Sequence, residues 1–199
     1  NAQLALNFDN QGFSYEAHVQ SDMLGVTSTL PTPYNKAADD AWPLNALIQG
    51  DDISNLIMVE LDEQLYFNGI LNNGEQQMSN AHLIVGKQNL GLNKQGFEVS
   101  VNLPEADILA WQPVLNNIID VAARSSGEPS VMPPLTKVVG QVGTAYVDAV
   151  PFNELEFTLI NQPAAMDLKL LAKELRARVD IPTGSQAQRR DIRAHADYL

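Results

Sequence analysis

The chain has 199 residues, of which 45% are hydrophobic and 18% are charged, and it contains no cysteine. Its formal net charge of −12 argues against nucleic acid as a partner, because phosphate groups select a basic surface. The missing cysteines exclude disulfides, thiolate nucleophiles, iron–sulfur clusters and zinc sites built on thiolates.

Strict alternation of apolar and polar residues predicts β-strands in the first part of the chain, because successive strand residues point to opposite faces. Residues 12–20 and 23–30 are the first two predicted strands, joined by a tight turn. Pro31 and Pro33 then stop the strand ladder, since proline has no amide hydrogen to donate. We expect the chain to cross over a small polar loop, with Trp42 packing on the sheet.

Five further alternating stretches follow this proline-rich bridge, and the sequence Asn72–Asn73–Gly74 between two of them is typical of a hairpin turn. The predicted strands cover residues 43–50, 53–61, 63–71, 81–86 and 96–103. Together with the strands before the bridge, they predict an antiparallel meander.

The pattern changes between Asp107 and Arg124, where apolar residues recur at intervals of three and four, as on one side of an amphipathic helix. These residues are Ile108, Trp111, Leu115, Ile118, Ile119 and Ala122. Because proline removes a donor and clashes inside a helix, we expect a turn before Pro113 and a regular helix from Pro113 onward.

A glycine- and proline-rich stretch at residues 125–134 follows the helix, and then alternation resumes. The later predicted strands cover residues 136–148, 153–161, 165–172, 175–182 and 190–199. Gly140 and Gly143 lie inside the first of these and are interpreted as a bend or bulge.

The predicted fold class is mainly β with one central helix (α+β), with curved antiparallel sheets that form either an open groove or a sandwich-like structure. The predicted parts are a β meander over residues 3–103, a helix and linker over 104–134, and a second antiparallel segment over 135–199. We expect these parts to form one continuous structural unit.

No arrangement of residues in the sequence predicts catalysis. His18, His82 and His195 are far apart, have no partner at metal-ligand spacing, and are interpreted as ordinary sheet residues. The pairs Asp39–Asp40 and Asp51–Asp52 lack the interleaved pattern of a calcium loop and are interpreted as turn residues. We therefore predict no enzymatic activity, no catalytic residue, no metal site and no cofactor.

Three stretches resemble the large AsmA-like envelope proteins, specifically the YhdP type. They are "LPTPYNKAADDAWPLNALI", "GFEVSVNLPEADILAWQPVL" and "ELRARVDIP", which together reach from Leu30 to Pro182. The resemblance implies the periplasmic part of a protein anchored in the inner membrane of a Gram-negative cell, with the anchor outside this fragment. It implies a non-catalytic bridge whose apolar groove carries phospholipid between the inner and outer membranes.

The partners that the resemblance implies are phospholipid acyl chains, neighbouring segments of the same full-length protein, and envelope proteins. The residues that we expect to contact lipid share alternating apolar positions: Phe97, Val99, Val101, Phe157, Leu159, Leu168 and Leu170. The alternative hypothesis is a structural β-sandwich module that binds a protein or a glycan in the cell envelope. From the residues alone, an apolar groove and a closed core stay equally open.

Overall fold

The computed structural model describes residues 1–10, 12–86, 96–124, 130–162, 165–182 and 193–198. By its internal contacts the chain divides into two compact units. The first contains residues 1–97 and 130–133, and the second contains residues 98–129 and 134–199. Trp42 belongs to the first unit and Trp111 to the second, and these are the two tryptophans of the sequence.

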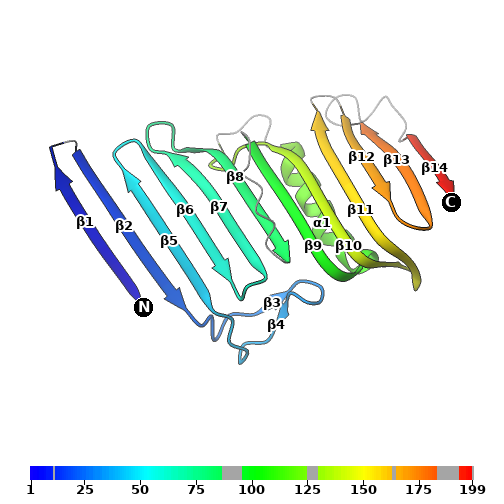
Figure 1. Cartoon of the computed structure of the whole chain (residues 1–199), viewed down its shortest axis with the longest axis horizontal. Helices are drawn as coiled ribbons and strands as arrows, with labels where there is room; N and C mark the ends of the chain where they lie inside the picture. The colour runs from blue at the N-terminus through cyan, green and yellow to red at the C-terminus, as the bar shows by residue number, and fades with distance from the viewer. Residues whose placement is uncertain (11, 87–95, 125–129, 163–164, 183–192, 199) are drawn as a thin grey trace. The chain divides into compact units, whose positions relative to one another are not determined.

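One antiparallel sheet forms most of the first unit, with the strand order β1-β2-β5-β6-β7-β8 (Figure 1). Its strands are β1 (Ala2–Asp9), β2 (Gly12–Ser21), β5 (Leu44–Asp51), β6 (Ser54–Leu61), β7 (Leu65–Asn72) and β8 (Gln77–Gly86). Every step after β2 is to the next long strand along the chain. The predicted meander and the hairpin at Asn72–Asn73–Gly74 are therefore confirmed within this unit.

The segment between β2 and β5 differs from its prediction, because residues 23–30 do not form a full strand. It contains only the two-residue strands β3 (Ser28–Thr29) and β4 (Asn35–Lys36), which pair with each other in a separate sheet. Backbone bonds within the segment, such as Gly25 to Ala38, replace a long ladder. The proline bridge is thus a small folded element of its own.

The second unit contains the helix α1 (Ile108–Arg124) and a sheet with the strand order β9-β10-β11-β12-β13-β14. Its strands are β9 (Gly96–Asp107), of which residues 98–107 belong to this unit, β10 (Leu135–Val147), β11 (Val150–Gln162), β12 (Ala165–Leu171), β13 (Leu175–Pro182) and β14 (Arg193–Tyr198). All pairs from β10 to β14 are antiparallel. Apart from the short β3–β4 pair, the described strands of each unit form one large sheet. The sandwich-like alternative is therefore wrong, whereas the mainly β class with one helix is confirmed.

The helix begins five residues earlier than predicted and contains Pro113 in its interior. Asp107 explains the early start, because its Oδ1 accepts hydrogen bonds from the backbone amides of Leu109 (3.0 Å) and Ala110 (3.2 Å). Such an N-cap satisfies amides that otherwise have no partner in the first turn. The helix therefore starts at Ile108, and Pro113 lies in its second turn.

Of the predicted helical stripe, Ile108 and Trp111 are half-buried, while the neighbouring Gln112 and Pro113 are exposed. The side chains at positions 115, 118, 119 and 122 lie outside the described ones, as do residues 125–129 of the predicted linker. The helix packs on β10.

Candidate functional site

One face of the second unit's sheet carries a continuous set of apolar side chains, because the strand register places alternating residues of each strand opposite one another. Leu159 pairs with Val138 on one side and with Leu168 on the other, and Leu168 pairs in turn with Val179. We call this set the apolar face of the second unit. Between β10 and β14 it consists of Val138, Gly140, Val142, Leu155, Phe157, Leu159, Met166, Leu168, Leu170, Leu175, Ala177, Val179, Ile181, Ala194 and Ala196.

A single amide lies at one end of this face. Asn161 pairs with Met166 in the ladder between β11 and β12, and its Nδ2 donates to the backbone carbonyl of Leu135 at 2.8 Å. This bond offsets the cost of placing an amide beside apolar side chains. The rows that run through Phe157 and Leu159 are therefore the purely apolar part of the face.

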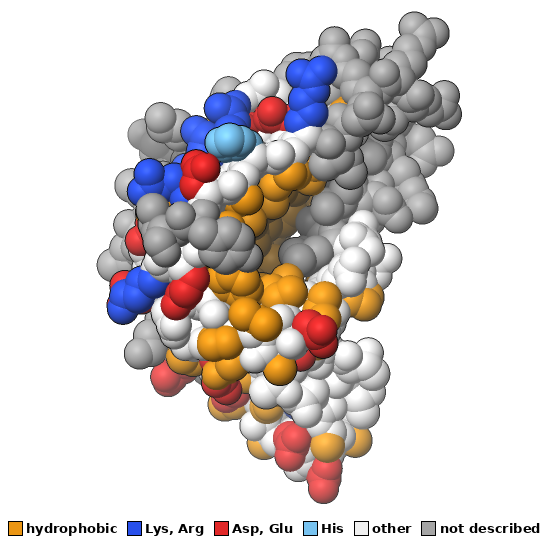
Figure 2. All heavy atoms as spheres, turned by 90° about the vertical axis from the view of Figure 1, so that its right-hand side faces the viewer, with side chains coloured by type: hydrophobic (Ala, Val, Ile, Leu, Met, Phe, Trp, Pro, Cys, Tyr) orange, Lys and Arg blue, Asp and Glu red, His pale blue; other side chains and the backbone are white. Residues whose placement is uncertain are grey.

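The opposite face of the same strands is polar and mostly charged. Glu156, Lys169, Arg178 and His195 alternate with the apolar residues, and the Arg178 guanidinium lies 3.0 Å from the carboxylate of Asp167. Figure 2 views this end of the molecule and shows hydrophobic side chains gathered in a recess, with charged side chains on the outer surface. The sheet of the second unit therefore has one apolar face and one polar, mostly charged face.

All seven residues predicted to contact lipid lie at alternating apolar positions. Phe157 pairs directly with Leu170, and Leu159 with Leu168, so these four form a contiguous block. Val101 joins the same face, since a Cβ atom added at Gly140 would lie 3.0 Å from its Cβ. Val99 follows by strand alternation. Phe97 has the same parity in β9 but is the last residue of the first unit's longer segment.

Burial separates the predicted residues into two groups. Val99 is only 6% exposed, and its neighbours on the same face, Leu103 and Val142, are 6% and 3% exposed. The other six, Phe97, Val101, Phe157, Leu159, Leu168 and Leu170, are only partly buried. Val99, Leu103 and Val142 are thus core, whereas the block on β11 and β12 keeps part of its surface uncovered.

The first unit's sheet also has one apolar face, by the same register argument. On it lie Leu4, Leu6, Phe8, Phe13, Tyr15, Ala17, Val19, Leu44, Ala46, Ile48, Gly50, Asn55, Ile57, Val59, Leu61, Leu65, Phe67, Gly69, Leu71, Ala81, Leu83 and Val85. The face is most open on β1, where Leu4, Leu6 and Phe8 are 64%, 55% and 74% exposed. The sequence analysis predicts no strand at β1, although apolar and polar or small residues alternate from Ala2 to Phe8.

Comparison with known protein families supplies the identification. The family model described as YhdP protein matches residues 1–199, which is the whole chain. The chain belongs to the YhdP family. No curated protein and no solved structure matches the chain. The resemblance stated on the sequence motifs is therefore confirmed.

The Leu-Pro-x-Pro-x-x-Lys stretch of this YhdP-family chain ends on Lys36, which is a buried cation. Its Nζ donates to the backbone carbonyls of Met23 (2.9 Å), Val26 (2.8 Å) and Ala37 (3.1 Å). Lys36 is 6% exposed and Tyr34 is 1% exposed, with the Tyr34 hydroxyl 3.4 Å from a backbone carbonyl oxygen of the β6–β7 turn. Burial raises the pKa of Tyr34 to about 12. The motif thus folds the segment between β2 and β5 around one lysine.

A hydrogen-bonded cluster interrupts the first unit's apolar face, and sequence reasoning missed it. The Tyr15 hydroxyl donates to Oδ1 of Asn55 (2.7 Å), Asn55 Nδ2 donates to Oδ1 of Asn73, and Asn73 Nδ2 donates to the carbonyl of Asp51 (2.9 Å). Asn55 is 8% exposed. A buried amide must find such partners to offset its desolvation. In this chain of the YhdP family, the cluster joins two turns to the sheet.

The aspartate pairs take part in turns, as predicted. Asp51 Oδ1 accepts from the backbone amides of Ser54 and Ile53, both at 2.8 Å, and these bonds hold its pKa below the ordinary value. Asp40 accepts from the amide of Ala37 at 3.0 Å. Both carboxylates are occupied by backbone amides, which suits a turn better than a catalytic role.

No chemical centre emerges from the part of this YhdP-family chain that the structure describes. Within it, no group of three or more His, Cys, Asp or Glu side chains is placed to hold a metal ion. The three histidines lie in separate strands, and His18 contacts the neighbouring Glu16 at 2.7 Å. Across the same described residues, no helix combines the length and the apolar character needed to cross a membrane.

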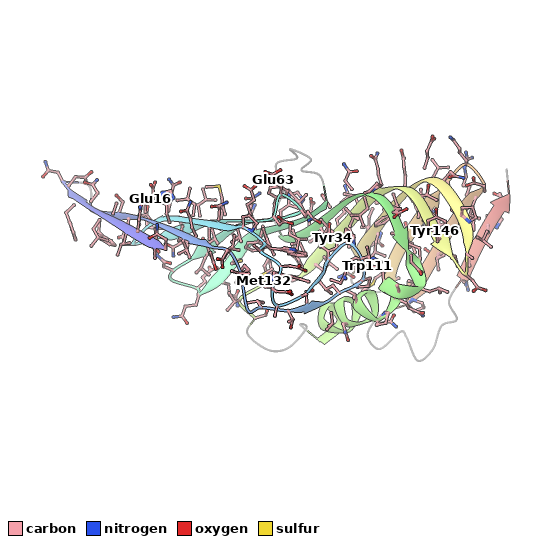
Figure 3. All side chains as sticks on the ribbon, turned by 90° about the horizontal axis from the view of Figure 1, so that it is seen from below. Glu16, Tyr34, Glu63, Trp111, Met132 and Tyr146 are labelled. Carbon is pink, nitrogen blue, oxygen red and sulfur yellow. The ribbon has the colours of Figure 1, made fainter. Side chains whose placement is uncertain are left out.

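Figure 3 shows how the labelled residues of the first unit lie about its sheet. Glu16 lies on one side, and Met132 lies on the other, where the segment carrying Tyr34 runs. Met132 belongs to residues 130–133, and the neighbouring Val131 accepts a backbone hydrogen bond from Met78 at 2.8 Å. Part of the first unit's apolar face is therefore covered by the unit's own segments.

Proposed function

We propose that the chain is a non-catalytic segment of a periplasmic, bridge-like protein that carries phospholipid acyl chains between the inner and outer membranes. The apolar face of the second unit is the groove surface in this proposal. Membership of the YhdP family supports a role in the envelope connected with lipid transport. Neighbouring segments of the full-length protein would continue the groove.

The observation that carries the proposal is the partly uncovered block Phe157, Leu159, Leu168 and Leu170. A sheet with one apolar face must cover it with another layer, and uncovered apolar area costs about 25 cal/mol for each Å² left in water. No second sheet covers this block among the described residues of the unit. An acyl chain lying on the block would remove that cost.

Charge supports the same arrangement of lipid and protein. The apolar face has no charged residue between β10 and β14, while Glu156, Lys169 and Arg178 lie on the opposite side of the sheet. An acyl chain can therefore lie on the apolar face without burying a charge, which would be costly. The phosphate head group would remain in water beyond the edge of the face.

Photocrosslinking tests this proposal with a matched pair of positions. A benzophenone amino acid replaces Leu168 on the apolar face, and in a second protein it replaces Lys169, the next residue of β12 on the opposite face. We expect phospholipid adducts, detected by mass spectrometry after irradiation in cells, at position 168 and not at position 169.

Two results would contradict the proposal. Adducts to protein alone at both positions would favour a structural β-module that binds a protein. Equal lipid adducts at positions 168 and 169 would mean that lipid adheres to the chain without regard to the face. Repeating the pair at Phe157 and Thr158, which neighbour one another in β11, checks that the result belongs to the face.

A further inference from the structure

Gly140 lacks a side chain on the apolar face of the second unit, and the ring of Phe157 occupies the space above it. Gly140 and Phe157 are direct partners in the antiparallel ladder between β10 and β11. A Cβ atom added at Gly140 would overlap Cζ and Cε1 of Phe157. The ring therefore lies across the glycine in a position that no other residue at 140 would permit.

The backbone of Gly140 does not itself require glycine. Gly12, Gly25, Gly86 and Gly96 have positive φ angles, and Gly140 is not among them. The reason for glycine at this position is therefore steric, and it lies in the ring of Phe157 and in the neighbouring β9 side chain, whose Cβ would be 3.0 Å away. Without the glycine, the ring would have to rotate away from the sheet.

A second glycine repeats this arrangement in the first unit. A Cβ atom at Gly69 would lie 3.1 Å from two atoms of the Phe67 ring and 3.2 Å from the sulfur of Met78. Gly69 and Phe67 are two residues apart in β7, and both lie on that unit's apolar face. In each unit, a phenylalanine ring thus lies against a glycine on the apolar side of the sheet.

We propose that Gly140 and Phe157 form a flat floor on the apolar face, which selects slender, unbranched acyl chains. This inference rests on the proposed function and names the class of hydrocarbon that the same face accepts. A ring lying across Gly140 adds apolar contact area where the glycine itself has no side chain. A straight chain can lie along such a floor in continuous contact, whereas methyl branches hold a branched chain away from it.

The test uses the 199-residue chain with the benzophenone amino acid at Leu168 and two kinds of vesicle, dioleoylphosphatidylcholine and diphytanoylphosphatidylcholine. The two lipids share a head group. The phytanoyl chains are saturated and carry methyl branches, whereas the oleoyl chains are unbranched, somewhat longer and contain a cis double bond. We expect about tenfold more adduct with the unbranched lipid, a ratio that corresponds to about 1.4 kcal/mol. Equal adduct from both lipids would overturn the inference while leaving the proposed function intact, whereas no adduct from either lipid would count against both.

Variants of the floor then assign the selectivity. Gly140→Ala should reduce the dioleoyl adduct roughly fivefold or more, because the added methyl group raises the ring and shortens the contact with the chain. Gly140→Ala with Phe157→Leu should restore it. Gly74→Ala is the control, since nothing lies within 4 Å of its added Cβ. Unchanged labelling in Gly140→Ala would contradict the proposed floor.

If Gly140→Ala does not fold, Phe157→Ala tests the same inference independently. Removing the ring deepens the face, so the ratio of unbranched to branched adduct should fall from about ten toward one. If that ratio stays at its original value in Phe157→Ala, the ring does not select the chain, and the inference fails.

Discussion

In both units the apolar face arises from the alternation of apolar and polar residues along the strands. The two faces differ in how many polar groups and covering segments lie on them. In the first unit, Tyr15 and Asn55 place a hydrogen-bonded cluster within the face, and the segment around Lys36 is folded against the unit. In the second unit, the rows that run through Phe157 and Leu159 contain no polar side chain from β10 to β14. The comparison indicates that the first unit uses part of its face for internal structure, while the second leaves more of its face available.

The largest expected effect is the loss of a fully buried side chain from the second unit. Met166 is 1% exposed on the apolar face, so Met166→Ala should lower the free energy of unfolding by about 2–5 kcal/mol. The control is Leu171→Ala in the same strand, which removes a side chain that is 41% exposed and should cost far less. Urea unfolding measures both. Equal losses would mean that the two sides of β12 do not differ as described.

A smaller effect is expected from the polar cluster of the first unit. Asn55→Ala leaves the Tyr15 hydroxyl without its acceptor and Asn73 without its donor, so it should cost about 1–3 kcal/mol. Asn45→Ala removes only an exposed bond of 3.3 Å to Gln20 and is the matched control. Urea titrations that find the two variants equally stable would show that the cluster does not support the unit.

Acid should weaken both units through one carboxylate each. Backbone hydrogen bonds from Ser54 and Ile53 hold the pKa of Asp51 below its ordinary value of 3.8, and hydrogen bonds from Asn153 hold the pKa of Glu174 below 4.5. A carboxylate with a depressed pKa in the folded state stabilises above its unfolded pKa, and that stabilisation is lost as the pH falls through the folded pKa. The contribution is therefore present at neutral pH and lost in acid.

Both carboxylates remain in contact with solvent, so this is the smallest of the three effects. Asp51→Asn and Glu174→Gln should each make the urea midpoint less dependent on pH between neutrality and about pH 3, a range that spans the ordinary values of 3.8 and 4.5. Because Asp51 lies in the first unit and Glu174 in the second, the two variants compare the units directly. A midpoint whose pH dependence is unchanged in both variants would mean that these bonds do not stabilise the turns.

Strands and their faces could be predicted from the sequence where tertiary structure agrees with local pattern. Alternation through Leu155, Phe157 and Leu159 is enough to place them on one face, because a strand has a period of two whatever its neighbours are. It cannot reveal how much of that face is covered, since coverage depends on how other elements pack against the sheet, as α1 packs on β10.

The wrong predictions have identifiable physical causes. Residues 23–30 alternate like a strand, but Lys36, ten or more residues away in sequence, binds the backbone carbonyls of Met23 and Val26. Pro113 suggests a late helix start, but the cap from Asp107 favours an earlier one. In both cases a specific contact outweighs the local preference.

Gly140 is a third case of the same kind. A glycine inside a strand pattern suggests a bend or bulge. In the structure it sits in a regular ladder and accommodates the ring of Phe157. The ring that explains the glycine comes from the next strand, and only the register of the two strands reveals it.

The placement of the two tryptophans, Trp42 in the first unit and Trp111 in the second, gives each unit its own intrinsic fluorophore. Tryptophan emission comes from the second unit alone in a Trp42→Phe chain, and from the first alone in a Trp111→Phe chain. Because the sequence has no cysteine, a single thiol introduced for a dye would also be unique. The thermal unfolding of each unit can thus be followed separately in the intact chain.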